Sequence, residues 1–285
     1  MGGTASIEKG LYVVATPIGN LKDMTARAIE VLQGVDLIAA EDTRHSNHLL
    51  KTFGINTRLI SFHDFSSSER LQKLVDKLIH GKSIALISDA GTPAISDPGY
   101  ELVRLARQQN VLVMPVPGAS AMLAALSVSG LPSDSFLFEG FLPAKSGVRK
   151  NRLQTLQSET RSMVFFETPH RIIAFLEDVI SVFGGEREIY FGRELTKIFE
   201  TSRLDTVFKC LEWVKGDSHQ QKGEFVLVIA GLPKAERVEL KLVEGLRILK
   251  ILLPEISTNK AAKLAALISG APKNKLYDTA IKHRR

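Results

Sequence analysis

Residues 88–99 bring hydroxyl, carboxylate and glycine groups together in one short segment, Ser-Asp-Ala-Gly-Thr-Pro-Ala-Ile-Ser-Asp-Pro-Gly. Glycine and small side chains let backbone N–H and C=O groups approach a ligand closely, and an Asp at a strand end can bind an ammonium or a hydroxyl. The segment follows the apolar run 83–87, and Asp97 with Pro98 is a typical helix start. An ordinary turn is the alternative, but a loop between a strand and a helix favours a ligand site.

Three other stretches of small and turn residues also follow expected strands. They are 15–21 after strand 11–14, 116–121 after 111–114, and 165–171 after 162–164. The carboxyl ends of parallel strands lie along one edge of an open α/β sheet, so we expect these loops to share a crevice. The chain contains neither G-x-G-x-x-G nor G-x-x-x-x-G-K-[ST], so a nucleoside-like ligand must be held in another way.

The apolar pattern predicts alternating strands and helices in the first half of the chain. The strands are 11–15, 35–39, 57–61, 83–88 and 111–115, and the helices are 24–33, capped by Asp23, 46–53, 68–80, 98–109 and 118–130. This alternation is typical of a mainly parallel sheet.

The segments 131–134 and 231–233 interrupt this pattern, and they predict three domains spanning 11–132, 134–232 and 234–285. The second is expected to be another α/β unit, with strands 136–140, 162–166, 187–192 and 224–230 and helices 149–158, 169–182 and 204–215. The third is expected to hold helices 236–252, 257–269 and 272–282. A turn at 269–272 between two short helices resembles a helix-turn-helix, although a plain two-helix packing unit fits its spacing equally well.

Positive charge is concentrated in the last domain. Residues 234–285 contain twelve Lys and Arg against five Asp and Glu, a net charge of +7, which leaves −1 for the rest of the chain. A basic tail favours a polyanionic partner, so Lys273 and Lys275 are candidate contacts to a nucleic acid. A second cluster, Lys145, Arg149, Lys150 and Arg152, is expected in a loop from which it reaches phosphates. A solvated surface is the alternative for both clusters.

Composition excludes several other classes of protein. The single Cys210 excludes an intramolecular disulfide framework and a Cys-rich zinc site, and the seven His show no H-E-x-x-H spacing, so no metal site is expected. No apolar run approaches the ~20 residues of a membrane span, and the first nine residues lack the features of a secretory signal. We therefore expect a cytoplasmic protein without a membrane partner.

Eight stretches together resemble one known family. They are TPIGNL (16–21), AEDTRHS (40–46), SDAGTPAISDPG (88–99), VPGASA (116–121), FEGFLP (138–143), FFETPHRI (165–172), RELTKIFE (193–200) and KGEFVLVI (222–229). On these the chain resembles the ribosomal RNA small subunit methyltransferase I family of the tetrapyrrole methylase superfamily, from Gly10 to its C-terminus. Thr16–Asn20 replaces the glycine-rich opening loop typical of the tetrapyrrole-specific enzymes, which argues against a porphyrin-like substrate.

The resemblance implies a fold, a cofactor and a substrate. The fold is two α/β units in tandem with the cofactor cleft between them, plus a small helical C-terminal module. The cofactor is S-adenosylmethionine, and the implied substrate is a cytidine ribose 2′-hydroxyl in the decoding region of 16S ribosomal RNA, either free or in the assembled small subunit. A homodimer is also implied. The implied cofactor residues are Pro17, Ser88, Asp89, Ala90, Gly91, Pro93, Ile95, Ser120, Ala121, Phe166, Glu167, Glu194, Leu195 and Glu224.

A ribose hydroxyl is a weak nucleophile, so a base or a charge-stabilising group should assist it. The candidates at the expected strand ends are Glu41, Asp42, Arg44, His63 and Lys197, and a structural salt bridge is the alternative for each.

Two other functions stay open: a small-molecule methyltransferase acting on a tetrapyrrole, and a non-catalytic nucleic-acid binder. The basic tail weighs against the first, and the full set of cofactor loops weighs against the second.

Overall fold

The first half of the chain forms a parallel sheet. The structure is a computed structural model that describes residues 7–63 and 68–282. The strands are β1 (Gly10–Val14), β2 (Leu37–Ala40), β3 (Leu59–Ser61), β4 (Ser83–Ile87) and β5 (Val113–Val116). Their order is β3-β2-β4-β1-β5 and every pairing is parallel. The loops after β1, β2, β4 and β5 therefore emerge side by side along one edge, as the alternation predicted.

Helices cover both faces of this sheet. They are α1 (Ala26–Gly34), α2 (Thr43–Thr52), α3 (Ser68–Ile79) and α4 (Tyr100–Gln108). Leu32 of α1 and Leu50 of α2 belong to one core, whereas Leu74 of α3 and Leu102 of α4 belong to the core on the other face. Strands buried on both sides read as continuous apolar runs, which is why the sequence indicated β4 clearly.

The second sheet is mixed rather than parallel. Its strands are β6 (Phe136–Phe141), β7 (Ser162–Glu167), β8 (Glu188–Arg193), β9 (Thr201–Thr206) and β10 (Phe225–Ile229), in the order β6-β7-β10-β8-β9. Only β6 and β7 run parallel. Strand β9 was not expected from the sequence because its residues, Thr-Ser-Arg-Leu-Asp-Thr, are mostly polar and lie at the sheet edge, where one face stays exposed.

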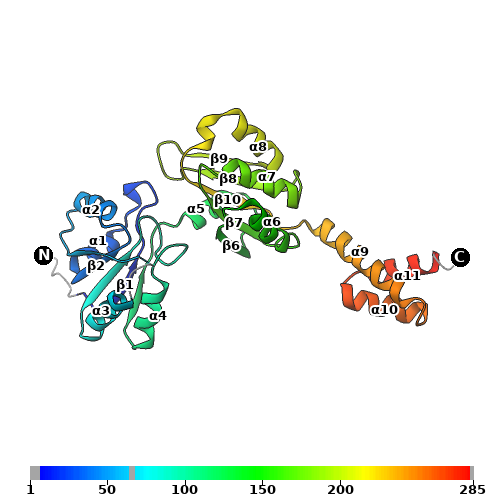
Figure 1. Ribbon diagram of the computed structural model, residues 1–285, viewed down its shortest axis with the longest axis horizontal. Helices are drawn as coiled ribbons and strands as arrows, with labels where there is room; N and C mark the ends of the chain where they lie inside the picture. Colours follow the sequence, from blue (N-terminus) through cyan, green and yellow to red (C-terminus); the bar gives the residue numbers. More distant parts are fainter. Residues whose placement is uncertain (1–6, 64–67, 283–285) are drawn as a thin grey trace.

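Helices also cover both faces of the second sheet. Helices α6 (Ser146–Thr155), α7 (Ile172–Phe183) and α8 (Val207–Gly216) lie over one face (Figure 1). The other face is covered by α5 (Ala121–Val128), whose Ala125 and Leu126 pack against Val226 and Val228 of β10. Helix α5 follows β5 of the first sheet directly, so it links the two sheets.

Two helix starts differ from the expectation. Asp23 closes a short 3-10 turn, η1 (Leu21–Asp23), and Thr25 caps α1 instead, by accepting the Ala28 N–H at 3.1 Å. The start expected at Asp97 is also wrong, because Gly99 occupies the N-cap position of α4. The preceding loop is contorted, with both Ala94 and Ser96 in the left-handed region at φ 66° and 61°. Such strain is typical of loops that other contacts hold in place.

The last three helices form a module of their own. They are α9 (Lys234–Leu252), α10 (Thr258–Ser269) and α11 (Lys273–Lys282), and they extend from the second sheet away from the first (Figure 1). Leu249, Ala262 and Leu276, one from each helix, share a core. Gly270 ends α10 in the left-handed conformation that helix ends favour. Within the described ranges, no helix is long and apolar enough to cross a membrane.

Candidate functional site

Three loops of the first sheet are tied into one wall. Thr16 and Gly91 exchange backbone hydrogen bonds of 2.9 and 3.0 Å, so the loop after β1 pairs with the loop after β4. The Thr92 hydroxyl donates to the Ala119 carbonyl at 3.2 Å, which adds the loop after β5. Gly91 has a φ of +80°, a conformation that L side chains rarely adopt. Hydrogen bonds between loops therefore build one wall of the expected crevice, whereas the loop at 165–171 follows β7 of the second sheet rather than sharing the first sheet's edge.

Two loops of the second sheet form the opposite wall. The Glu194 N–H donates to the Glu224 carbonyl at 2.9 Å, and the Glu224 N–H donates back to Glu194 Oε1 at 2.8 Å. A Cβ on Gly223 would lie 2.5 Å from Glu194 Cγ, so only glycine lets the Glu194 carboxylate approach. These contacts fix the Glu194 carboxylate and join the end of β8 to the start of β10.

A cavity of about 250 Å³ lies between the two walls. The first sheet contributes mostly small and polar residues together with Ile18 and Ile95, and the second contributes three phenylalanine rings and three glutamates. Its lining comprises Ile18, Ala90, Gly91, Thr92, Ile95, Ser96, Asp97, Ser120, Ala121, Phe141, Phe166, Glu167, Thr168, Pro169, Glu194, Leu195, Lys197, Glu224, Phe225 and Val226. We call it the first cavity.

The aromatic part of the first cavity is a cluster on the second sheet. The Phe166 ring lies edge-on to Phe138 and Phe141, with centroids 5.1 and 5.5 Å apart. Gly140 brings this strand close to the first sheet, since a Cβ there would lie 2.7 Å from Ser96 Oγ. The cavity therefore offers a flat apolar surface on one side and backbone groups on the other.

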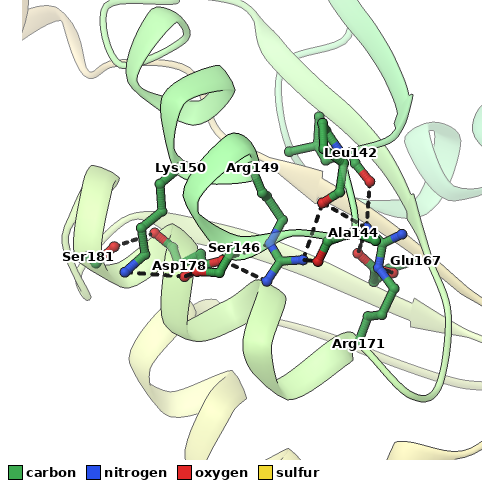
Figure 2. Close-up of polar contacts among 10 residues, drawn as sticks. Leu142, Ala144, Ser146, Arg149, Lys150, Glu167, Arg171, Asp178 and Ser181 are labelled. Carbon is green, nitrogen blue, oxygen red and sulfur yellow. Dashed lines mark hydrogen bonds and ion pairs between the residues drawn. The ribbon is translucent and has the colours of Figure 1, made fainter.

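Glu167 is a buried carboxylate in the wall of the first cavity. Its Oε1 accepts the Thr168 N–H at 2.8 Å and lies 3.0 Å from Arg171 Nε. Arg171 also donates to the Leu142 carbonyl, as Figure 2 shows, and to the Pro143 carbonyl. Burial raises the pKa of Glu167, and these hydrogen bonds offset only part of that effect. Arg171 thus joins the cavity wall to the loop after β6.

Lys197 stands between two carboxylates at the mouth of the first cavity. Its Nζ lies 2.9 Å from Glu194 Oε1 and 2.8 Å from Glu224 Oε2. Its stem crosses to the first sheet, because a Cβ on Gly19 would lie 2.3 Å from Lys197 Cγ. Burial disfavours the charged form of Lys197, but the hydrogen bonds to Glu224 and Glu194 outweigh burial and raise its pKa. Lys197 is therefore a cation at neutral pH.

A second cavity of about 370 Å³ also has Lys197 in its lining. Its lining comprises Pro17, Ile18, Gly19, Leu21, His45, His48, Leu49, Asp89, Ala90, Lys197 and Glu224. The two cavities share Ile18, Ala90, Lys197 and Glu224. Ligands in the two cavities would therefore meet at this shared border.

Most of the expected cofactor residues line the first cavity: Ala90, Gly91, Ile95, Ser120, Ala121, Phe166, Glu167, Glu194, Leu195 and Glu224. Pro17 and Asp89 line the second cavity instead, and within the described chain Ser88 and Pro93 line neither. Ser88 is buried, and its hydroxyl donates to the Ala90 carbonyl at 3.3 Å.

The candidate catalytic residues are spread more widely. Lys197 lines both cavities, whereas Glu41, Asp42, Arg44 and His63 line neither cavity in the described structure. Asp42 caps α2 by accepting the Arg44 N–H at 2.7 Å, and the Arg44 side chain is 92% exposed. Among the described residues, no group of three or more His, Cys, Asp and Glu could hold a metal ion.

Several lining residues were not expected from the sequence. His45 and His48 lie three apart on α2, a spacing that places two side chains on one helix face. Asp97 was assigned to a helix cap, and Phe141 carried no signal beyond its place in the FEGFLP stretch.

The expected RNA contacts at 145–152 need a correction. These residues lie on or next to helix α6 rather than in a loop. Arg149 is only 2% exposed, and its guanidinium donates to Asp178 Oδ2 at 2.7 Å (Figure 2). Lys150 Nζ lies 3.3 Å from Asp178 Oδ1. Arg152 donates to both Glu139 oxygens, at 2.9 and 2.7 Å. Arg149 cannot reach a phosphate, because it neutralises a buried carboxylate.

Comparison with known sequences gives two matching families and close relatives. Residues 10–209 match the tetrapyrrole (corrin/porphyrin) methylases, and residues 240–284 match the RsmI C-terminal HTH domain. The chain is 50% identical to the ribosomal RNA small subunit methyltransferase I of Pseudomonas aeruginosa, over 96% of this chain and 97% of that one. It is 45% identical to the enzyme of that name from Synechocystis sp., over 95% and 97% of the two chains.

Solved structures share the fold at low sequence identity. A diphthine synthase superposes with a TM-score of 0.59 and 16% identity, covering 77% of this chain and 89% of its own. The cobalt precorrin-4 methyltransferase CbiF gives a TM-score of 0.56 at 14% identity, covering 81% and 97%. At these identities the likeness concerns the architecture alone.

Proposed function

The chain belongs to the ribosomal RNA small subunit methyltransferase I family of tetrapyrrole (corrin/porphyrin) methylases, and from that premise we propose how its cavities serve the reaction. It is an S-adenosylmethionine-dependent methyltransferase of small-subunit ribosomal RNA. The proposal is that the first cavity holds the cofactor and that the methyl acceptor is the ribose 2′-oxygen of a cytidine. The observation that carries it is the pair of adjoining cavities that meet at Lys197.

The first cavity has the groups that S-adenosylmethionine requires. The Phe166 and Phe141 rings offer a flat apolar surface suited to adenine, and the small residues at 90–91 leave backbone groups accessible. The carboxylates of Glu194, Glu224 and Asp97 suit a ligand with an ammonium, hydroxyls and a positive sulfur. When bound, the cofactor supplies a methyl group that is already activated as an electrophile. The protein's task is then mainly alignment of the acceptor oxygen with that methyl.

Lys197 is the candidate charge-stabilising group. Its raised pKa keeps the ammonium protonated, so it does not accept the hydroxyl proton at neutral pH. As a cation at the shared border it stabilises negative charge that develops on the acceptor oxygen. Glu194 and Glu224 hold the ammonium in place and limit its repulsion of a cationic cofactor.

The acceptor atom is tested by the chemistry of the product. We expect labelled methyl to pass from S-adenosylmethionine to small-subunit RNA and not to tetrapyrroles offered separately. A 2′-O-methyl ribose resists alkaline cleavage of the adjoining phosphodiester, so hydrolysis should leave one labelled dinucleotide beginning with cytidine. Recovery of the label on a mononucleotide base would overturn the ribose assignment but keep the methyltransferase.

The C-terminal module is proposed to bind the RNA. Lys273 and Lys275 are exposed at the start of α11, directly after the turn that joins it to α10. The match of this segment to an HTH domain and its net charge of +7 over 234–285 support a contact with phosphates.

The division of the chain into domains at 11–132, 134–232 and 234–285 remains a proposal, supported by the separate core of the last helices.

We also propose a homodimer in the cytoplasm, where ribosomal RNA is available to the enzyme. Strand β9 is a sheet edge that carries exposed Leu204, and a Cβ on Gly130 would lie 3.2 Å from Leu204 Cδ2. Val128 at the end of α5 and Phe208 at the start of α8 are exposed as well. Light scattering should give twice the chain mass, and Phe208→Glu with Val128→Glu should shift it to the monomer value. A monomeric parent protein would exclude the dimer.

A further inference from the structure

We propose that the second cavity binds one nucleotide of the RNA substrate and that His45 and His48 of α2 are its contact residues. The proposal rests on the methyl transfer to RNA proposed above and names the place of the acceptor nucleotide. Neither histidine is part of the cofactor cavity.

The position of the second cavity fits an acceptor. It shares Ile18, Ala90, Lys197 and Glu224 with the first cavity, so a ligand in it borders a ligand in the other. Methyl transfer requires the acceptor oxygen to lie in line with the methyl group and close to it. A nucleotide in the second cavity would place its ribose near the Lys197 ammonium, where the oxygen's charge develops.

The lining of the second cavity suits a nucleobase. Leu21 and Leu49 provide apolar surface, and the imidazoles of His45 and His48 are flat groups on which an unstacked base can lie. Asp89 uses one carboxylate oxygen, Oδ1, to accept the Asp42 N–H at 3.0 Å. A carboxylate has further acceptor sites, and an acidic side chain pairs well with the amino group of cytosine.

The same hydrogen bond fixes the helix that carries the histidines. Asp89 at the end of β4 holds the Asp42 N–H, and Asp42 caps α2. With the start of α2 held in this way, His45, His48 and Leu49 of the helix line the cavity. Arg44, His48 and Lys51 recur at helical spacing on α2, and all three are exposed. Arg44 and Lys51 on this face offer cations to the phosphates on either side of a bound nucleotide.

The kinetic test compares a double variant with a matched control. His45→Ala with His48→Ala should lower kcat/KM for small ribosomal subunits that lack the methyl group by about tenfold to a hundredfold, as expected when the stacking surface for one base is removed. The affinity for S-adenosylmethionine, measured by calorimetry, should stay within about twofold of the parent. The control is His80→Ala, a surface histidine at the end of α3 that lines neither described cavity.

A binding measurement keeps the test decisive if the double variant fails to fold. The imidazole proton resonances of His45 and His48 should shift when a cytidine-containing trinucleotide is added to the parent protein saturated with S-adenosylhomocysteine, and those of His80 should not.

Three results are distinguishable. A parent protein that methylates no ribosomal RNA overturns the proposed function. A parent that is active, with a folded double variant of unchanged kcat/KM, overturns the acceptor site alone. Unshifted His45 and His48 resonances overturn it as well.

Discussion

Helices α2 and α6 carry similar basic runs, Thr-Arg-His-Ser-Asn-His-Leu-Leu-Lys at 43–51 and Ser-Gly-Val-Arg-Lys-Asn-Arg at 146–152, in opposite surroundings. On α6, Arg149 is buried against Asp178 and Arg152 is held by Glu139. On α2, Arg44 and Lys51 are exposed, and His45 and His48 of the same helix line the second cavity. Carboxylates placed by other elements engage the charges of α6, whereas Arg44 of α2 lies 3.5 Å from Asp42, which caps its own helix, and its side chain stays 92% exposed. Partners, rather than the number of basic residues, therefore decide which cluster can bind RNA.

The largest effect is expected where the α6 cluster is broken. Asp178→Ala leaves the Arg149 guanidinium buried without its carboxylate, and should lower the free energy of unfolding by about 3–5 kcal/mol. Denaturant unfolding checks this. The control is Arg149→Met with Asp178→Leu, which should recover most of the loss because it removes both charges. Unchanged stability of Asp178→Ala would contradict a structural role for this cluster.

The next effect concerns the wall of the first cavity. Gly91→Val forces a β-branched residue into a φ of +80°, within 3.4 Å of Ile18 Cγ2. Strain of about 1–3 kcal/mol should distort the loop and weaken S-adenosylmethionine binding by roughly tenfold to a hundredfold. Calorimetry measures the affinity for S-adenosylmethionine. Gly81 has a similar φ of +76° with nothing within 4 Å, so Gly81→Val should lower stability without changing cofactor affinity. If Gly81→Val weakened cofactor binding as much as Gly91→Val, the loss of affinity would be due to strain in the fold as a whole and not to the cavity wall.

The basic residues of α2 and α6 can be compared directly by neutralising two of them on or next to each helix. Arg44→Gln with Lys51→Gln should weaken RNA binding several-fold and flatten its salt dependence by about one unit of slope for each cation that no longer pairs with a phosphate. Lys145→Gln with Lys150→Gln should change both quantities less, because Lys150 already faces Asp178. Filter binding at several salt concentrations provides the measurement. If the α6 pair weakened RNA binding more than the α2 pair, α6 rather than α2 would be the helix that contacts RNA.

The smallest effect concerns pH and Lys197, a paired cation that still faces both cavities. Its folded-state pKa is raised, so the stabilisation from its ion pairs is fully present below the ordinary lysine pKa and is lost only as pH rises through the raised value. Lys197→Met should therefore slow methyl transfer without moving any inflection of the rate between about pH 6 and 9. Loss of such an inflection in the variant would make Lys197 a base rather than a fixed cation.

Local sequence patterns were sufficient for much of the fold and of the first cavity. The apolar run of β4 and the small residues after it are adjacent in the chain, so the loop at 88–99 could be placed at a strand end from sequence alone. Ser120 and Ala121 could be placed at a strand end from the sequence in the same way. The edge strand β9 escaped detection because a polar strand has no apolar period. Asp97 was assigned to a cap because its role depends on a cavity formed with the second sheet.

Apart from the polar edge strand β9, the sequence by itself determined the order of strands and helices, the loops that line the first cavity and the family, because each was recognised from short stretches of neighbouring residues. Only the tertiary structure decided that Arg149 is buried, since its partner Asp178 lies 29 residues away on another helix. It also decided that α5 covers the second sheet, because a helix that is apolar on nearly every side carries no local signal for the sheet it packs against. Packing and charge pairing are set by long-range contacts, and these give the basic residues of α2 and α6 different roles.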